Sequence, residues 1–132
     1  MVIGQHDRKL LMIPCHHMED VFANPAQLPN WQAAADGQQV DWDEVFAGYN
    51  TAVDWPTAHY WRELAAFYPD AEILLSVRPA GRWWESFSGT IKKILKIRST
   101  IPDAYPRSVT DMANKIILLR QDELVAPRIS AT

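Results

Sequence analysis

Residues 72–88, EILLSVRPAGRWWESFS, constrain the fold more than any other stretch of this chain. The apolar run within Glu72–Arg78 predicts a strand, and such a nearly continuous run is typical of a parallel strand covered by helices on both faces. The Pro-Ala-Gly sequence that follows predicts a turn into a helix that carries Ser86. An arginine at the carboxyl end of a strand and a hydroxyl on the next helix can bind phosphate, because ligands of open α/β sheets bind at this edge.

Helices are predicted along most of the remaining chain. Asn24 before a proline and Asp41 before an acidic turn are both typical N-cap residues, and Gly37 is placed to end the helix between them. The predicted helices are one from Asn24 to Ala35, one capped by Asp41, one from Asp54 or Thr57 to Phe67, one that includes Trp84 to Leu95, and a last one over Val109–Gln121. This pattern favours a helix-rich α/β protein.

The predicted sheet is incomplete. A buried parallel strand needs neighbours on both sides, whereas only Val2–Gly4 and Leu10–Ile13 offer further strand candidates. We therefore expect a single domain over 1–132 with one strong parallel strand, Glu72–Arg78, and a frayed tail over 122–132. Since an uncovered strand edge invites pairing, a homo-oligomer is compatible with this architecture.

Composition narrows the classes of function. The chain is 48% hydrophobic and 22% charged, as in ordinary globular proteins, and its net charge of −3 gives no basic surplus for nucleic-acid binding. No apolar window is long enough to span a membrane. The single cysteine, Cys15, fits a reducing compartment. We expect a cytoplasmic protein without nucleic-acid or membrane partners.

A cluster of metal-ligand residue types lies at Cys15, His16, His17 and Glu19. Adjacent histidines point in different directions on any regular element, and no second cluster completes a four-ligand zinc site. We therefore expect no metal at this position.

The chain from Pro14 to about Ile94 resembles a family of bacterial and eukaryotic sulfotransferase-like proteins with a P-loop α/β fold. The matching segments are PCHHMEDVFANP at 14–25, WQAAADG at 31–37, VDWDEVFAGY at 40–49, AVDWP at 52–56, YWRELAAFYPDA at 60–71, and ILLSVR with WWES at 73–86. They follow the family's order and spacing over well over half of the chain. The resemblance implies a partial P-loop-type three-layer domain.

The resemblance also implies an activity, the transfer of a sulfuryl group from 3′-phosphoadenosine-5′-phosphosulfate to a small-molecule hydroxyl or amine. Arg78 and Ser86 match the family's arginine and serine that hold the 3′-phosphate of this donor. His17 occupies the position of the family's usual histidine and is a candidate general base. Asp54 is a second candidate base, and a helix N-cap is an equally good interpretation of this residue.

The sequence departs from the family at both ends. Family members follow their first strand with a glycine-rich turn that cradles the phosphosulfate, whereas Gln5–Lys9 follow Val2–Gly4 here without such a turn. The C-terminal third of the family's domain is also without a counterpart, so we expect a shortened copy. The alternative function is a non-catalytic helical module, derived from that family, which binds a partner or a small ligand.

Overall fold

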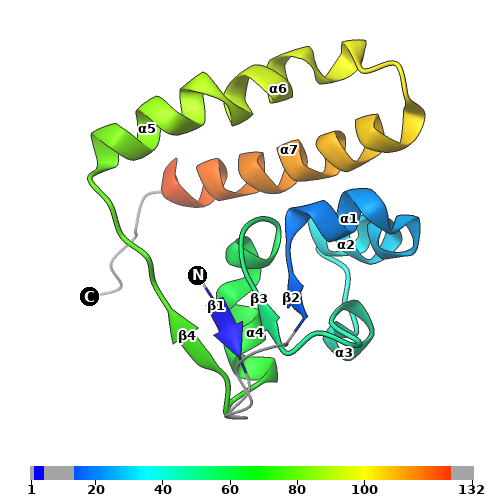
Figure 1. The fold of residues 1–132 in the computed structure, drawn as a ribbon, viewed down its shortest axis with the longest axis vertical. Coiled ribbons are helices and arrows are strands. Elements are labelled where there is room, and N and C mark those ends of the chain that lie inside the picture. Colours follow the sequence, from blue (N-terminus) through cyan, green and yellow to red (C-terminus); the bar gives the residue numbers. More distant parts are fainter. Residues whose placement is uncertain (1, 5–13, 126–132) are drawn as a thin grey trace.

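The computed structural model describes residues 2–4 and 14–125, and Figure 1 shows the arrangement of their helices and strands. The strands are β1 (Val2–Gly4), β2 (Cys15–His16), β3 (Thr51–Ala52) and β4 (Glu72–Leu74). The α-helices are α1 (Met18–Ala23), α2 (Leu28–Ala35), α3 (Trp42–Val45), α4 (Trp61–Phe67), α5 (Ala80–Gly89), α6 (Ile91–Ile97) and α7 (Ala104–Val125). Short 3₁₀ helices are η1 (Pro25–Gln27), η2 (Thr57–Tyr60) and η3 (Arg98–Thr100). The predicted helix-rich α/β class is confirmed.

The four strands form one small sheet in the order β2-β3-β1-β4. Strands β2 and β3 are parallel, and β1 runs antiparallel to both β3 and β4. The predicted strand Val2–Gly4 is confirmed as β1, whereas the candidate Leu10–Ile13 lies outside the described residues.

The prediction for Glu72–Arg78 was wrong in length, direction and burial. The strand ends at Leu74, which pairs with Val2, and its neighbour β1 is antiparallel. A strand continues only while a neighbour supplies backbone partners, and β1 is three residues long. No helix of the described chain buries this segment, so Leu75 and Val77 are each 79% exposed.

The predicted helix caps are confirmed. The Asn24 side chain accepts a hydrogen bond from the N–H of Ala26 at the start of η1, and Asp41 accepts one from the N–H of Asp43 at the start of α3. Gly37 follows α2 with a φ of 72°, a left-handed conformation that glycine adopts without a Cβ clash. These local interactions fix the ends of the helices that carry the core.

The last helix is longer than predicted. It begins at Ala104 and continues to Val125, which includes the first residues of the expected frayed tail. Residues 126–132 lie outside the described part of the chain. Among the helices that the structure describes, none has both the length and the apolar character needed to cross a membrane.

The hydrophobic core lies between α1, α2, α4 and α7. Its fully buried side chains include Val21, Trp31, Leu64 and Ile116, one from each of these helices. The Trp31 ring packs against the rings of Trp42 on α3 and Tyr60 on η2, with centroid distances of 5.6 and 6.1 Å. Aromatic groups at such distances pack favourably in edge or tilted arrangements.

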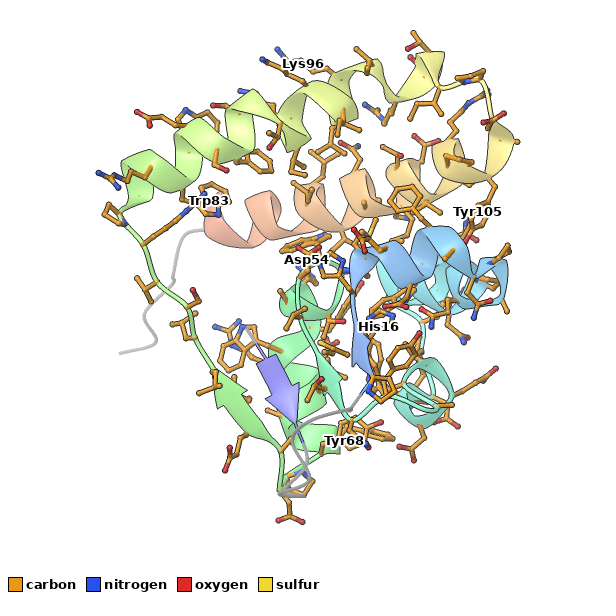
Figure 2. The ribbon with its side chains drawn as sticks, in the orientation of Figure 1. His16, Asp54, Tyr68, Trp83, Lys96 and Tyr105 are labelled. Carbon is orange, nitrogen blue, oxygen red and sulfur yellow. The ribbon has the colours of Figure 1, made fainter. Side chains whose placement is uncertain are left out.

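Helices α5 and α6 lie along α7, on the side away from α1 and α2 in Figure 1. No residue of α5 is buried, and Leu95 is the buried residue of α6. Trp83 and Trp84 on α5 are each 50% exposed, and Figure 2 shows Trp83 between the start of α5 and the end of α7. The β4–α5 part of the chain thus displays apolar surface that the core does not use.

Replacing a buried leucine with alanine should lower the stability of this protein more than replacing an exposed one. We expect Leu64→Ala to lower the free energy of unfolding by about 2–5 kcal/mol, since the substitution leaves a cavity where a fully buried side chain packs. The matched control Leu118→Ala, at a residue 49% exposed on α7, should cost less than about 1 kcal/mol. Urea unfolding followed by circular dichroism measures both, and equal losses would contradict this placement of the core.

Candidate functional site

Two side chains that are far apart in the sequence, His17 and Asp54, meet at the carboxyl ends of β2 and β3. Nε2 of His17 lies 3.3 Å from Oδ2 of Asp54. The two side chains are 42% and 46% exposed, so solutes can reach the pair. Figure 2 shows Asp54 close to the junction of β2 and α1.

The parallel pairing of β2 with β3 explains this meeting. His16 is opposite Ala52, and the N–H of Val53 donates a 2.9 Å hydrogen bond to the carbonyl of His16. The next residues of both strands therefore leave the sheet at the same edge. This is the edge where parallel sheets bind ligands, although it belongs to β2 and β3 and not to the predicted strand β4.

The backbone of Asp54 has an unusual conformation. Its φ is 66°, in the left-handed region that non-glycine residues seldom occupy. The Asp54 carbonyl accepts a hydrogen bond from the N–H of Ala58, but the next helical segment, η2, has Pro56 at its N-cap and no side-chain cap. The helix-cap interpretation of Asp54 is therefore wrong, because the carboxylate points to His17.

The hydrogen bonds of His17 define where its ring proton lies. Nδ1 accepts a 3.2 Å hydrogen bond from the N–H of Glu19, while the backbone N–H of His17 donates to Oδ2 of Asp20 at 2.7 Å. These two bonds form a capping box at the start of α1. Since Nδ1 is an acceptor, the neutral ring carries its proton on Nε2 and donates it toward Asp54.

Arg78 and Ser86 occupy a different region. Arg78 lies in the segment between β4 and α5 and is exposed, as is Ser86 on α5. In Figure 1 the segment from β4 through α5 runs along another side of the molecule from the junction of β2 and α1. The start of α5 has no side-chain cap, which leaves the first N–H groups of the helix available to an anion.

His16 has a structural environment that the sequence analysis did not predict. It is fully buried among the rings of Trp31, Phe46 and Tyr49. Nε2 lies 2.7 Å from Oε1 of Gln27, and Nδ1 lies 3.5 Å from Oγ1 of Thr57. Burial lowers the pKa of His16, and the bond to Gln27 opposes this effect only in part.

The alternation of side chains along a strand was the signal that could have revealed this role, because consecutive residues of β2 must face opposite sides. His16 faces the core and His17 follows on the accessible side. Within the described residues, no group of three or more histidine, cysteine, aspartate or glutamate side chains is placed to hold a metal ion.

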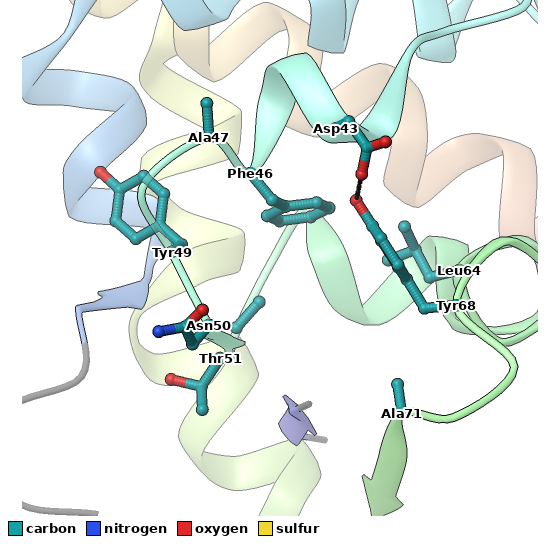
Figure 3. A pocket seen from close by; sticks show the side chains of 10 residues that line it. Asp43, Phe46, Ala47, Tyr49, Asn50, Thr51, Leu64, Tyr68 and Ala71 are labelled. Carbon is teal, nitrogen blue, oxygen red and sulfur yellow. Dashed lines mark hydrogen bonds between the residues drawn. The ribbon is translucent and has the colours of Figure 1, made fainter. Parts of the chain in front are cut away.

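A cavity of about 260 Å³ lies apart from the His17–Asp54 pair, and Figure 3 shows its walls. Its described lining residues are Asp43, Phe46, Ala47, Tyr49, Asn50, Thr51, Ala52, Leu64, Tyr68 and Ala71. The Tyr68 hydroxyl donates a 2.8 Å hydrogen bond to Oδ1 of Asp43 across one side. Burial is the main cause that raises the pKa of Tyr68, and the nearby Asp43 adds to it. The cavity therefore combines apolar walls with a neutral phenol and a carboxylate.

Comparisons with known proteins identify the family of this chain. The family model described as a sulfotransferase domain matches residues 5–124. The chain therefore belongs to the sulfotransferase family, which confirms the resemblance found in the sequence. A curated relative, "Ava biosynthesis cluster protein M" of Aspergillus versicolor, is 28% identical over 101 residues, which is 70% of this chain and 39% of the relative. The chain thus spans well under half of the length of this relative.

The buried His16 predicts a pH dependence of stability. The unfolded chain protonates this group near its ordinary pKa of 6.5, whereas the folded chain does so only at lower pH. The unfolded state therefore binds more protons below about pH 6.5, and the free energy of unfolding should fall as the pH is lowered through this range. Urea unfolding between pH 8 and pH 5 should show a smaller decrease in His16→Asn than in wild type, and identical decreases would contradict this role of burial.

The left-handed backbone of Asp54 predicts that glycine is tolerated better than alanine. Both Asp54→Gly and Asp54→Ala remove the contact with His17, so the difference between them isolates the backbone conformation. We expect Asp54→Gly to be more stable than Asp54→Ala by about 1 kcal/mol, because a φ of 66° disfavours residues with a Cβ. Thermal unfolding of the two variants tests this, and a more stable Asp54→Ala would show that the loop does not impose this conformation.

Proposed function

We propose that this chain transfers a sulfuryl group from 3′-phosphoadenosine-5′-phosphosulfate to a hydroxyl or amine of a small molecule. The observation that carries this proposal is the accessible contact between His17 and Asp54 in a member of the sulfotransferase family. Two groups able to move a proton meet there from separate segments of the chain, as general acid–base chemistry requires. The lone cysteine, Cys15, supports a reducing cytoplasmic setting.

The hydrogen bonds assign different tasks to the two residues. His17 uses Nδ1 to accept from the backbone and directs its Nε2–H to Asp54, so it has no free lone pair for a substrate proton. In our proposal the second oxygen of Asp54 accepts the proton of the bound hydroxyl or amine. His17 orients the carboxylate and acts as the positioning residue.

The donor would be held at the junction of β4 and α5. Arg78 offers an exposed guanidinium, and the uncapped start of α5 adds backbone N–H groups, which together fit a phosphate group. Ser86 lies further along the same helix and offers a hydroxyl. When bound, the donor supplies an activated sulfuryl group and leaves as adenosine 3′,5′-bisphosphate.

A second candidate is a module that binds a small molecule without catalysis. The cavity beside Phe46 and Tyr68 supports it, because neither His17 nor Asp54 lines that space. Arg78 and Ser86 belong to the segment from β4 through α5, whereas His17 and Asp54 follow β2 and β3, and this separation along the fold also favours binding over chemistry.

Calorimetric titration with adenosine 3′,5′-bisphosphate tests the donor site. We expect binding that Arg78→Ala weakens at least about tenfold, because a charge-assisted bond between arginine and phosphate is lost. Arg62→Ala is the matched control, since it removes another exposed arginine, which lies on α4 outside the proposed donor site, and should change the affinity much less.

The outcomes separate the two functions. Nucleotide binding together with sulfuryl transfer to phenols or amines, lost in Asp54→Asn, supports the enzyme. Nucleotide binding without transfer supports the binding module. If wild type binds no nucleotide even at millimolar concentration, the proposed transfer reaction is overturned.

A further inference from the structure

We propose that the cavity beside Phe46 and Tyr68 binds a small organic cation, an ammonium group carried on an aromatic or branched aliphatic body. This inference rests on the second candidate function and deepens it, because it names the class of molecule that the same cavity takes. The cavity volume of about 260 Å³ lies just below the usual range for small-molecule sites, about 300–1,000 Å³, so the ligand must be small.

The cavity does not overlap the His17–Asp54 pair. It is lined by Tyr49 and Asn50, which precede β3, and by both residues of β3 itself. The His17–Asp54 pair is instead built from residues that follow β2 and β3. A ligand in the cavity therefore leaves the site of the proposed proton transfer unoccupied.

Aromatic rings form much of the wall of the cavity. Phe46, Tyr49 and Tyr68 contribute these rings, and Leu64 adds aliphatic surface. Figure 3 shows the Phe46 ring beside the hydrogen bond that joins Tyr68 to Asp43. Aromatic faces bury apolar groups, and they also attract a cation that comes within about 6 Å of the ring centre. The wall can therefore accept both the apolar body and the charged end of such a ligand.

The polar groups of the cavity favour a ligand that donates hydrogen bonds. The Tyr68 hydroxyl donates its proton to Oδ1 of Asp43 at 2.8 Å. Since a phenol has a single proton and a carboxylate has none, these two groups offer a ligand only lone pairs. A carboxylate has about four acceptor positions, so Asp43 can bind a further donor. An ammonium group supplies such donors together with a positive charge, whereas an anionic ligand would meet acceptors of its own kind.

The charges around the cavity also favour a cation. Among the lining residues that the structure describes, none is a lysine or arginine. Burial is the main cause that raises the pKa of Tyr68, and Asp43 and Asp41 add to it, so two carboxylates act on this side of the cavity. Residues 14–61 contain no lysine or arginine, and their acidic residues are Glu19, Asp20, Asp36, Asp41, Asp43, Glu44 and Asp54. Such a one-sided charge distribution attracts cations.

Calorimetric titration with phenethylamine and with its neutral analogue, phenethyl alcohol, tests the proposal. We expect wild type to bind the amine at least about tenfold more tightly, because only the ammonium group forms a charge-assisted hydrogen bond with Asp43. In Asp43→Asn this preference should disappear, since the amide has nearly the same size and no charge. Tyr68→Phe should weaken amine binding by about twofold to tenfold, because one acceptor is lost.

Asp54→Asn is the matched control, because it makes the same chemical change at an accessible carboxylate outside the cavity. This variant should keep the preference for the amine. NMR titration locates the ligand independently: the amide signals of Ala47, Asn50 and Ala71, which line the cavity, should shift, whereas those of α5 should not. Circular dichroism checks that each variant folds.

The possible failures have different meanings. A preference that Asp54→Asn loses and Asp43→Asn keeps would place the amine at the His17–Asp54 pair and overturn the proposal, as would signal shifts confined to residues outside the cavity. Equal binding of amine and alcohol by wild type would overturn the cation and leave a module for neutral molecules. No binding of either at millimolar concentration would overturn this use of the cavity altogether. The nucleotide titration with Arg78→Ala tests sulfuryl transfer separately, with a different ligand and a different variant.

Discussion

The two-residue parallel pairing of β2 with β3 is the contact on which the rest of the site depends. It places His16 opposite Ala52 and directs the first histidine into the core. The following residue, His17, then leaves the sheet beside the loop that carries Asp54. Because a strand alternates its faces, one short pairing provides both a buried packing residue and an accessible proton-transfer candidate.

The core supports this pairing from one side. Trp31 on α2 and Leu64 on α4 are fully buried, and α7 closes the core with Ile116. The His16 ring lies 5.7 Å from the Trp31 ring, so the core and the site share a contact. A change in the packing of α2 would therefore alter the position of His16, and with it the start of α1 and the contact between His17 and Asp54.

The β4–α5 region is organised differently. Its apolar side chains are exposed, and no strand of the described chain covers the outer edge of β4. The exposed apolar side chains of this region therefore contribute nothing to the core formed by α1, α2, α4 and α7.

Much of the local structure could be predicted from the sequence. The caps at Asn24 and Asp41 and the glycine after α2 depend on short-range hydrogen bonds and backbone sterics, which a few neighbouring residues determine. The prediction for Glu72–Arg78 failed because strand length and burial depend on neighbouring strands and helices. Those neighbours come from elsewhere in the chain, so hydrophobicity alone cannot reveal whether they exist.

The sequence by itself determined the family, several helix caps and the residue types of the site, because these follow from local patterns and from the order of the matching segments. The tertiary structure alone decided which candidates meet. His17 and Asp54 are brought together by strand pairing, whereas Arg78 and Ser86 belong to the separate segment from β4 through α5. The physical reason is that contacts between distant segments arise from packing and register, which are properties of the folded chain and not of any short stretch within it.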